Sequence, residues 1–127
     1  MKFRTTHNSI RLRLRKSELT LLKDHLKVSE SIDFPSGAQF IVSLEIKDLM
    51  SAVNAKFEAQ VLSVYISTEV ADQWIDTEDV GIERFIELPN HERLHILIEK
   101  DFPCLDRPNE DKSDTFWELA DQEPDVC

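Results

Sequence analysis

The feature that most constrains this fold is a strict alternation near the N-terminus. Ile10, Leu12 and Leu14 alternate there with Arg11, Arg13 and Arg15, and a period of two is that of a β-strand with one apolar and one polar face. Further strand-like runs are expected around Phe3 and at 28–34, 39–46, 56–59, 61–66, 81–88 and 94–100. We therefore expect a protein built mainly of strands.

Two short helices are expected between these strands. Ser17 precedes Glu18 and leucines with helical spacing, which predicts a helix over 18–27 with Ser17 as its N-cap. Ser67 is followed by Thr68 and Glu69 with the same capping chemistry, and Val70 and Trp74 lie four residues apart on one helical face. Residues 47–55 are compatible with either a loop or a single helical turn.

The element order suggests an internal repeat. Strand, helix, strand and strand follow one another over about 10–48 and again over about 62–101. This order predicts an α+β fold, a mainly antiparallel β barrel or sandwich made of two β-α-β-β pseudo-repeats with two short helices. Because identities between the halves are few, an α+β domain without a repeat is the alternative.

The chain is long enough for one core, so we expect a single globular domain over 1–105. From Asp106 the apolar residues thin out while prolines recur and acidic residues dominate. Such a segment buries too little to offset its ordering entropy. Residues 106–127 are therefore predicted to be an acidic tail, disordered or loosely docked through Phe116 and Trp117.

Charge is distributed unevenly along the chain. Residues 1–16 contain six basic and no acidic residues, whereas 101–127 contain nine acidic against two basic ones. The net charge of −10 disfavours binding to a nucleic-acid backbone. Because no apolar run is long enough for a membrane helix and no signal peptide is visible, we expect a cytoplasmic protein without a membrane partner. Cys104 and Cys127 have no CxxC spacing and are expected to be reduced thiols.

One literal metal motif occurs, with the HExxH spacing, at residues 91–95. Zinc would require both histidines on one helical face. The motif instead follows a turn signal at Pro89 and runs into a strand, where residues four apart are about 13 Å apart. The acidic residues of 109–114 lack the glycine of a calcium loop, and no phosphate-binding glycine loop occurs. We therefore expect no metal, no cofactor and no catalytic residue.

The arginines of the alternating strand are the candidate binding site. Projecting into one cavity, Arg11, Arg13 and Arg15 would bind phosphate or carboxylate groups in a bidentate manner. Alternatively they lie on an exposed face and pair across strands with Glu45, Glu83, Glu87 or Glu99, or with the acidic tail. Trp117 and Phe116, aromatic residues in an acidic stretch, are candidate anchors for a partner or for the tail itself.

Two functional hypotheses follow. The first is a non-enzymatic binding or interaction domain whose basic strand takes a protein partner or a small anionic ligand, with the acidic tail as a competing occupant. The second is an enzyme or binder acting on phosphate-bearing small molecules, in which the arginines form a clamp and Glu99 or Glu45 holds a metal.

The sequence also resembles a family of small bacterial proteins, a domain of unknown function. The resemblance rests on Asn8–Leu14 followed by Ser17-Glu18, on Val80–Glu83, and on Ile98–Phe102 with Cys104-Leu105, and it spans most of 2–116. Members tend to end in Phe-Pro-Asn-Pro, whereas here Phe116 is followed by Trp117-Glu118 and the chain continues. The resemblance implies no activity.

Overall fold

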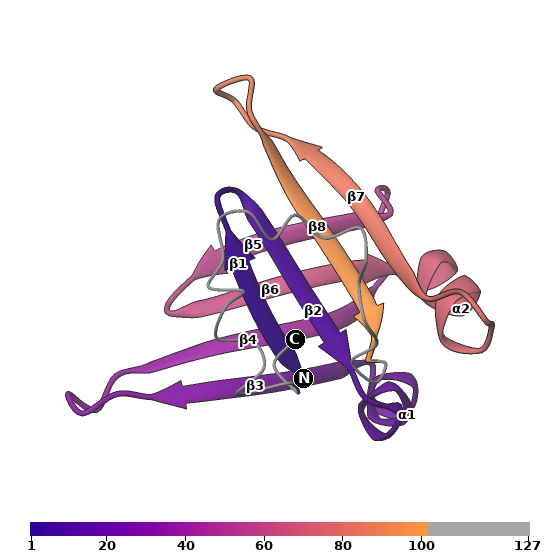
Figure 1. The fold of residues 1–127 in the computed structure, drawn as a ribbon, viewed down its shortest axis with the longest axis horizontal. Coiled ribbons are helices and arrows are strands. Elements are labelled where there is room, and N and C mark those ends of the chain that lie inside the picture. Colours follow the sequence, from indigo (N-terminus) through magenta and orange to yellow (C-terminus); the bar gives the residue numbers. More distant parts are fainter. Residues whose placement is uncertain (102–127) are drawn as a thin grey trace, which may run out of the picture.

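The computed structural model describes residues 1–101, which form eight strands and two helices (Figure 1). The first half of this order is β1 (Lys2–Thr6), β2 (Ser9–Leu14), α1 (Lys16–His25), β3 (Lys27–Asp33) and β4 (Gln39–Lys47). The second half is β5 (Val53–Glu58), β6 (Val61–Ser67), α2 (Thr68–Ile75), β7 (Gly81–Glu87) and β8 (Arg93–Lys100). All the expected strands are found. The strand expected over 56–59 begins earlier, at Val53, so the loop or helical turn expected over 47–55 is a loop limited to 48–52.

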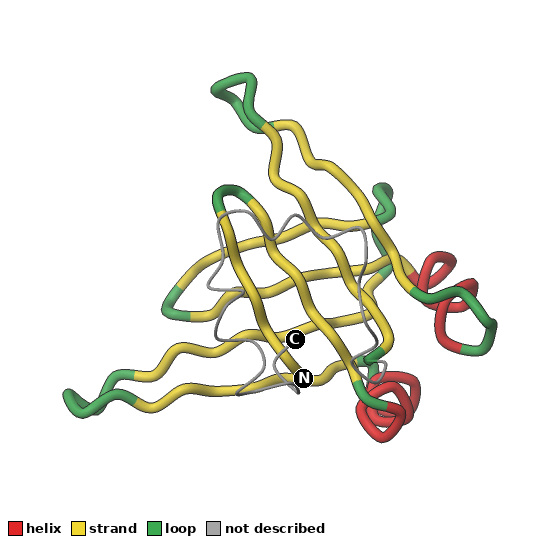
Figure 2. Tube along the Cα trace, viewed as in Figure 1, coloured by secondary structure: helices red, strands yellow, loops and turns green. Residues whose placement is uncertain are grey.

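The strands form two four-stranded sheets. Sheet A has the order β1-β2-β8-β7, and sheet B has the order β3-β4-β6-β5. The strands of sheet A cross in front of those of sheet B, and the β7–β8 hairpin of one and the β3–β4 hairpin of the other project beyond the overlap (Figure 2). The sheets do not close on one another, so the barrel alternative is wrong and a sandwich-like α+β fold is found.

Each sheet combines one hairpin from each half of the chain, and the two hairpins pair at the centre of the sheet. β2 pairs with β8, and β4 with β6, and both of these central pairings are parallel. The outer pairings β1–β2, β7–β8, β3–β4 and β5–β6 are antiparallel. Sheet B therefore uses the middle of the chain, whereas sheet A joins the N-terminal hairpin to the hairpin that ends at Lys100. Each half has the order strand, strand, helix, strand, strand; a repeat in the sequence itself stays a prediction.

Each helix carries the chain from one sheet to the other, α1 from β2 to β3 and α2 from β6 to β7. Ser67 caps α2 as expected, because its hydroxyl accepts a hydrogen bond from the Val70 amide at 3.2 Å. The prediction of Ser17 as a cap is wrong. The first helix begins after Arg15, whose amide donates to the Glu18 carboxylate at 2.9 Å, and it ends at His25, followed by the C-cap Leu26, whose φ of 63° is left-handed.

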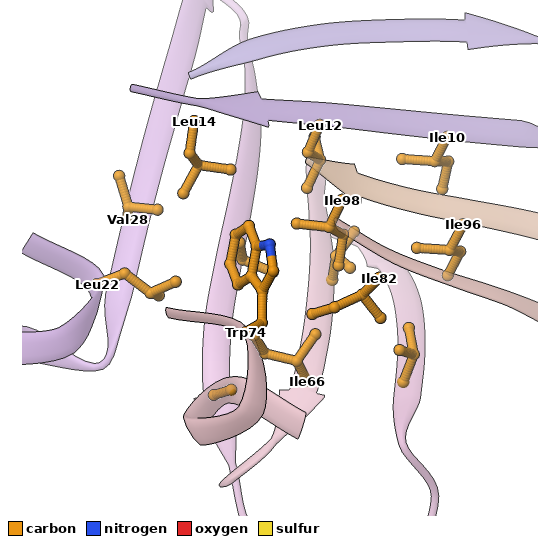
Figure 3. Close-up of a cluster of buried hydrophobic side chains, with 14 of the residues drawn as sticks. Ile10, Leu12, Leu14, Leu22, Val28, Ile66, Trp74, Ile82, Ile96 and Ile98 are labelled. Carbon is orange, nitrogen blue, oxygen red and sulfur yellow. The ribbon is translucent and has the colours of Figure 1, made fainter. Parts of the chain in front are cut away.

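The core lies between the sheets and beside the helices (Figure 3). Leu12, Leu14, Ile96 and Ile98 of sheet A meet the buried residues of sheet B and the Trp74 indole, whose Nε1 donates to the Val80 carbonyl at 3.2 Å. Most of this set is fully buried, which is the main source of folding free energy.

The aromatic residues of the strands and helices do not all lie in this core. Trp74 is buried and Phe40 is partly buried. Phe57, on the edge strand β5, is 66% exposed, and Phe85 is 55% exposed because it lies on the side of β7 opposite to the buried Ile82. Alternation predicts that a side chain shares a face with its neighbours at i±2, but not whether another layer covers that face.

Candidate functional site: a basic patch on sheet A

Alternation along β2 determines where its arginines lie. Ile10, Leu12 and Leu14 enter the core, so Arg11 and Arg13 project from the opposite side of sheet A. We call this side the outer face of sheet A. The arginines therefore lie outside the space between the sheets and not in an enclosed tunnel.

Pairing with the neighbouring strands brings further charges to the outer face. Lys2 of β1 is opposite Arg13, and Arg4 is opposite Arg11. On the other side, Glu99 of β8 is opposite Arg13. We define Lys2, Arg4, Arg11 and Arg13 as the basic patch. Cross-strand neighbours lie about 4.5–5.5 Å apart at their Cβ atoms, so these four cations form one continuous surface.

Two carboxylates at the edge of the basic patch offset part of its charge. Glu99 accepts a hydrogen bond from Arg11 Nε at 2.6 Å, which confirms the expected pairing of an arginine with Glu99. Asp101 lies 3.2 Å from Lys2 Nζ and 3.9 Å from Arg13 Nε. Its own amide donates to the Leu14 carbonyl at 2.8 Å and fixes the chain beside the end of β2.

Arg13 has one buried hydrogen-bond donor without a partner among residues 1–101. Only 6% of its side chain is exposed, and its nearest carboxylate oxygens, on Asp101 and Glu99, are 3.9 and 4.0 Å from Nε. These distances are too long for hydrogen bonds. Within residues 1–101, the Arg13 Nε has no hydrogen-bond partner. A buried donor without an acceptor costs about 1–3 kcal/mol, and more when it carries charge.

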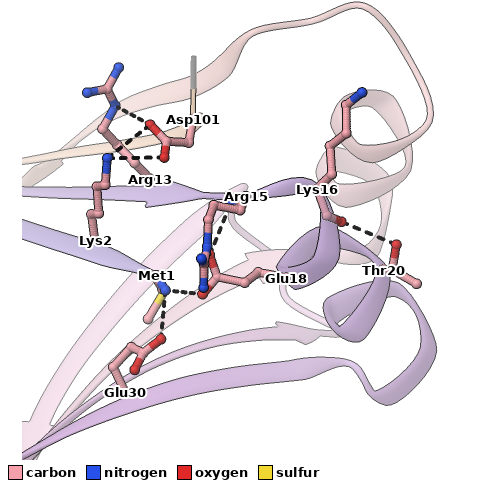
Figure 4. Close-up of polar contacts among 9 residues, drawn as sticks. All are labelled: Met1, Lys2, Arg13, Arg15, Lys16, Glu18, Thr20, Glu30 and Asp101. Atoms are coloured by element: carbon pink, nitrogen blue, oxygen red, sulfur yellow. Dashed lines mark hydrogen bonds and ion pairs between the residues drawn. The ribbon is translucent and has the colours of Figure 1, made fainter. Parts of the chain in front are cut away.

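Arg15 does not belong to this site. β2 ends at Leu14, and the Arg15 side chain is 70% exposed with its Nε 3.4 Å from Glu18 (Figure 4). The structure thus brings together two of the three predicted arginines. The third is separated because the strand period stops where the helix begins.

Glu18 also takes part in a second polar cluster, at the N-terminal amine. The Met1 amine binds Glu18, and it lies 2.6 Å from Glu30 of β3 (Figure 4). Burial alone would lower the pKa of the amine, but hydrogen bonds to both carboxylates outweigh it and raise the pKa above 8.0. Burial alone would raise the pKa of Glu18, but its bonds to the amine and to Arg15 hold that pKa below 4.5. We call these three groups the amine clamp.

Gly81 has a steric role next to the basic patch. It is opposite Glu99 in the β7–β8 pairing. A Cβ atom at this position would lie 2.7 Å from the Ile98 carbonyl oxygen and 3.1 Å from the Glu99 Cγ. Only glycine lets the two strands approach this closely.

A surface pocket of about 560 Å³ occupies the other end of the outer face. It lies between the β1–β2 turn and the β7–β8 hairpin, and Phe85, Arg93 and His95 are among its lining residues. The His95 ring stacks on Phe85 with centroids 4.6 Å apart, and His95 Nε2 lies 2.8 Å from Glu83.

The residues of the HExxH match do not converge. His91 occupies the β7–β8 turn with a left-handed φ of 64°, Glu92 accepts a hydrogen bond from Asn8, and His95 lies in β8. The placement of the motif in a turn and a strand is confirmed. In the described part of the chain, no group of three or more metal-binding side chains is close enough to hold an ion.

Sequence reasoning identified the arginines but missed their surroundings. Asp101 as a partner of Lys2 and Arg13 depends on the parallel β2–β8 register, which has no signature in a single sequence. The predicted anchors Phe116 and Trp117, the two cysteines and the acidic tail lie outside the described residues. No helix within 1–101 is long and apolar enough to cross a membrane.

Comparisons with known proteins identify the family only. No curated protein and no solved structure matches the chain. One family model does match, over residues 1–119, and it is described as a family of unknown function (DUF7009). The match includes both sheets, the basic patch and 18 residues beyond Asp101. The chain belongs to this family.

Proposed function

We infer that this chain is a non-enzymatic binding domain that holds an acidic, extended peptide segment on the basic patch. The single observation that carries this inference is the buried Arg13 guanidinium, whose Nε has no hydrogen-bond partner among the described residues. A guanidinium can bind a carboxylate through two parallel hydrogen bonds. An added carboxylate would therefore supply the acceptor that Arg13 lacks.

The neighbours of Arg13 support a carboxylate ligand of limited charge. Arg11 and Lys2 already face Glu99 and Asp101. These two carboxylates offset part of the positive charge of the patch. A ligand carboxylate is attracted by the basic side chains of the patch. It is repelled by the Glu99 and Asp101 carboxylates if it approaches them. This balance favours selectivity over bulk affinity.

The shape of the site supports an extended segment. The patch spans the neighbouring strands β1 and β2, and side chains on one side of an extended peptide repeat at about twice 3.3 Å. Every second side chain of such a peptide could meet the arginines of β2, which also lie two residues apart.

The second candidate is an enzyme or binder for phosphate-bearing small molecules. It needs an enclosed, water-excluding site with arginines beside metal-binding carboxylates. The arginines instead lie on the outer face, and Glu45, one of the expected metal-binding residues, lies on β4 of the other sheet. These placements favour the peptide-binding proposal, and phosphate binding becomes an outcome of its test.

The test is fluorescence anisotropy with a labelled peptide of alternating Glu and Ser, titrated with the full chain. Arg13→Gln should weaken binding at least tenfold, about 1.4 kcal/mol, whereas Lys56→Gln on sheet B should not change it. The titration is repeated with Asp106, Glu110, Asp111 and Asp114 changed to amides, so that the chain's own carboxylates do not compete. Absence of binding to both forms contradicts the proposal. Displacement of the peptide by inorganic pyrophosphate at lower concentration would favour the second candidate.

A further inference from the structure

The surface pocket lies on the same outer face as the basic patch. Thr6, Ser9, His95 and Phe85 are successive cross-strand partners, one from each strand of sheet A. All four line the pocket of about 560 Å³. Ser9 lies four residues before Arg13 on β2, and a period of two puts both side chains on one side of the sheet. The pocket and the patch are therefore two ends of one continuous surface.

Contacts between two turns hold the pocket in shape. The Asn8 side chain, in the β1–β2 turn, donates to the Glu92 carboxylate at 2.6 Å, and the Asn8 carbonyl accepts a hydrogen bond from the His95 amide at 2.8 Å. His7 Nε2 lies 3.9 Å from the same carboxylate. These contacts join the β1–β2 turn to the β7–β8 hairpin. A ligand therefore does not have to order the pocket as it binds, which lowers the entropic cost of binding.

Phe85 gives the pocket an aromatic surface. Its side chain is 55% exposed, although the ring stacks on the His95 ring at 4.6 Å and lies 5.9 Å from the guanidinium carbon of Arg93. A concave site lined by an aromatic ring and a few polar groups is typical of ligand binding. A second planar ring that packs against Phe85 would also meet this guanidinium.

The two cationic groups beside Phe85 already have partners. His95 Nε2 lies 2.8 Å from Glu83, and Arg93 Nε lies 3.0 Å from Glu87. An acidic ligand group would have to displace one of these carboxylates, whereas an uncharged ring would leave both pairs in place. The pocket thus favours an aromatic side chain, in contrast to the basic patch.

The distance between the pocket and the patch suits an extended peptide. Ser9 and Arg13 are four residues apart on β2, which is about 13 Å at about 3.3 Å per residue. Side chains four residues apart in an extended peptide point to the same side and are separated by the same distance. A peptide that lies along β2 with a carboxylate at Arg13 therefore brings the side chain four residues away to the pocket.

We propose that the pocket binds a planar aromatic side chain of the acidic peptide, four residues from the carboxylate that Arg13 binds. The ligand class is thereby an acidic segment with an aromatic residue at this spacing. The spacing rests on the proposed function, because it is counted from Arg13. The preference of the pocket for a ring depends on the pocket alone.

Two labelled peptides of identical composition test the spacing by fluorescence anisotropy with the full chain. The first is an alternating Glu–Ser heptapeptide with tryptophan in place of its last glutamate, so that the ring lies on the same side as the glutamates and four residues from one of them. In the second, the tryptophan and the serine before it are exchanged, which turns the ring to the opposite side. The first should bind about tenfold more tightly, because ring stacking and cation–π contacts add to the ion pair. A reversed pair of sequences covers the opposite direction of the peptide.

A double-mutant cycle identifies the carboxylate. Arg13→Gln should weaken binding of the first peptide about tenfold, and so should glutamine in place of the peptide glutamate four residues from the tryptophan. Both changes together should cost little more than one, because each removes the same contact. Glutamine in place of the glutamate two residues from the tryptophan should have a smaller effect, since Arg11 is already bonded to Glu99.

Matched variants identify the pocket. Phe85→Ala should remove the tenfold gain from tryptophan, whereas Phe57→Ala, at an exposed phenylalanine of sheet B, should leave it unchanged. The NMR signals of the His95 ring should shift with the first peptide and not with the alternating Glu–Ser peptide. Unshifted amide signals elsewhere check that each variant is folded.

Equal affinity for the two tryptophan peptides in both directions, or a gain that survives Phe85→Ala, would overturn the proposal. If the alternating Glu–Ser peptide binds through Arg13 and tryptophan adds nothing, the proposed function is upheld and the pocket proposal fails. If the gain from tryptophan requires Phe85 but Arg13→Gln changes no affinity, the preference for a ring is upheld and the proposed function fails; the two are thereby distinguished.

Discussion

Sheets A and B share one backbone plan and differ in what their outer faces present. In each sheet two antiparallel hairpins meet through a parallel central pair. At the centre of sheet B the outer residue is Ser43, which is small and 1% exposed. On the outer face of sheet A, Arg13 lies near the end of the β2–β8 pairing, where it is buried and its Nε has no hydrogen-bond partner among residues 1–101. The two sheets therefore share their pairing plan, whereas single residues make their outer faces differ in charge.

The largest expected effect tests whether the sheets contribute equally to one core. Leu12 of β2 and Leu44 of β4 are both fully buried. Leu12→Ala and Leu44→Ala should each lower the free energy of unfolding by about 2–5 kcal/mol, because each leaves a cavity. Urea denaturation measures both. A loss below about 1 kcal/mol for one of them would mean that its sheet is not part of the shared core.

The two glycines provide the next contrast. Gly81→Ala should cost about 1–3 kcal/mol, because its Cβ would collide with the Ile98 carbonyl. Gly37→Ala, in the β3–β4 turn, should cost about 1–2 kcal/mol through its φ of 90° alone. Since Gly81 is opposite Glu99, only Gly81→Ala should also change the affinity for the acidic peptide. Equal affinity in both variants would show that the β7–β8 spacing does not shape the patch.

Arg13 and Ser43 compare the two outer faces directly. Removing one partner of a buried ion pair destabilises a protein when the other charge is left unpaired. Glu99 and Asp101 keep Arg11 and Lys2 as partners, so Arg13→Met should change stability by no more than about 1 kcal/mol. The same variant should weaken acidic-peptide binding at least tenfold, whereas Ser43→Ala should leave binding unchanged. Severe unfolding of Arg13→Met, seen by thermal denaturation, would instead assign Arg13 a structural role.

The smallest expected effect concerns the amine clamp, which ties β1 of sheet A to α1 and to β3 of sheet B. The pKa of the amine is raised above 8.0, so its contribution to stability is present below pH 8 and is lost as the pH rises through the raised value. The pKa of Glu18 is lowered below 4.5, so its contribution is present above pH 4.5 and is lost as the pH falls through the lowered value.

Stability measured by urea denaturation should therefore be greatest between about pH 4.5 and 8.0, as far as this cluster contributes. Glu18→Gln should flatten both limbs, and Glu92→Gln, at an exposed hairpin position, serves as its control. An unchanged pH profile in Glu18→Gln would show that the clamp does not couple the two sheets.

Local patterns predicted most of the elements but not how they combine. Period-two alternation identified the strands and placed Arg11 and Arg13 on one face, because these features depend on neighbours two residues apart. The prediction of Ser67 as a helix cap, made from its hydroxyl and the residues after it, is confirmed. Ser17 is not a cap, because the helix begins one residue earlier, where the Arg15 amide donates to the Glu18 carboxylate. The parallel registers that bring Glu99 and Asp101 to the arginines depend on contacts between distant segments, which a single sequence does not encode locally.

The origin of each sheet in the chain has a consequence for synthesis. Sheet B uses residues 27–67 and can be completed while the rest of the chain is still being made. Sheet A needs β8, which lies between β2 and β7. One edge of β2 therefore has no strand partner until residue 100 has been added. Long-range pairing of this kind slows folding and leaves an open strand edge in the interim. If synthesis paused between β6 and β8, the chain would have a complete sheet B and an N-terminal hairpin with an unpaired edge. An unpaired strand edge favours aggregation.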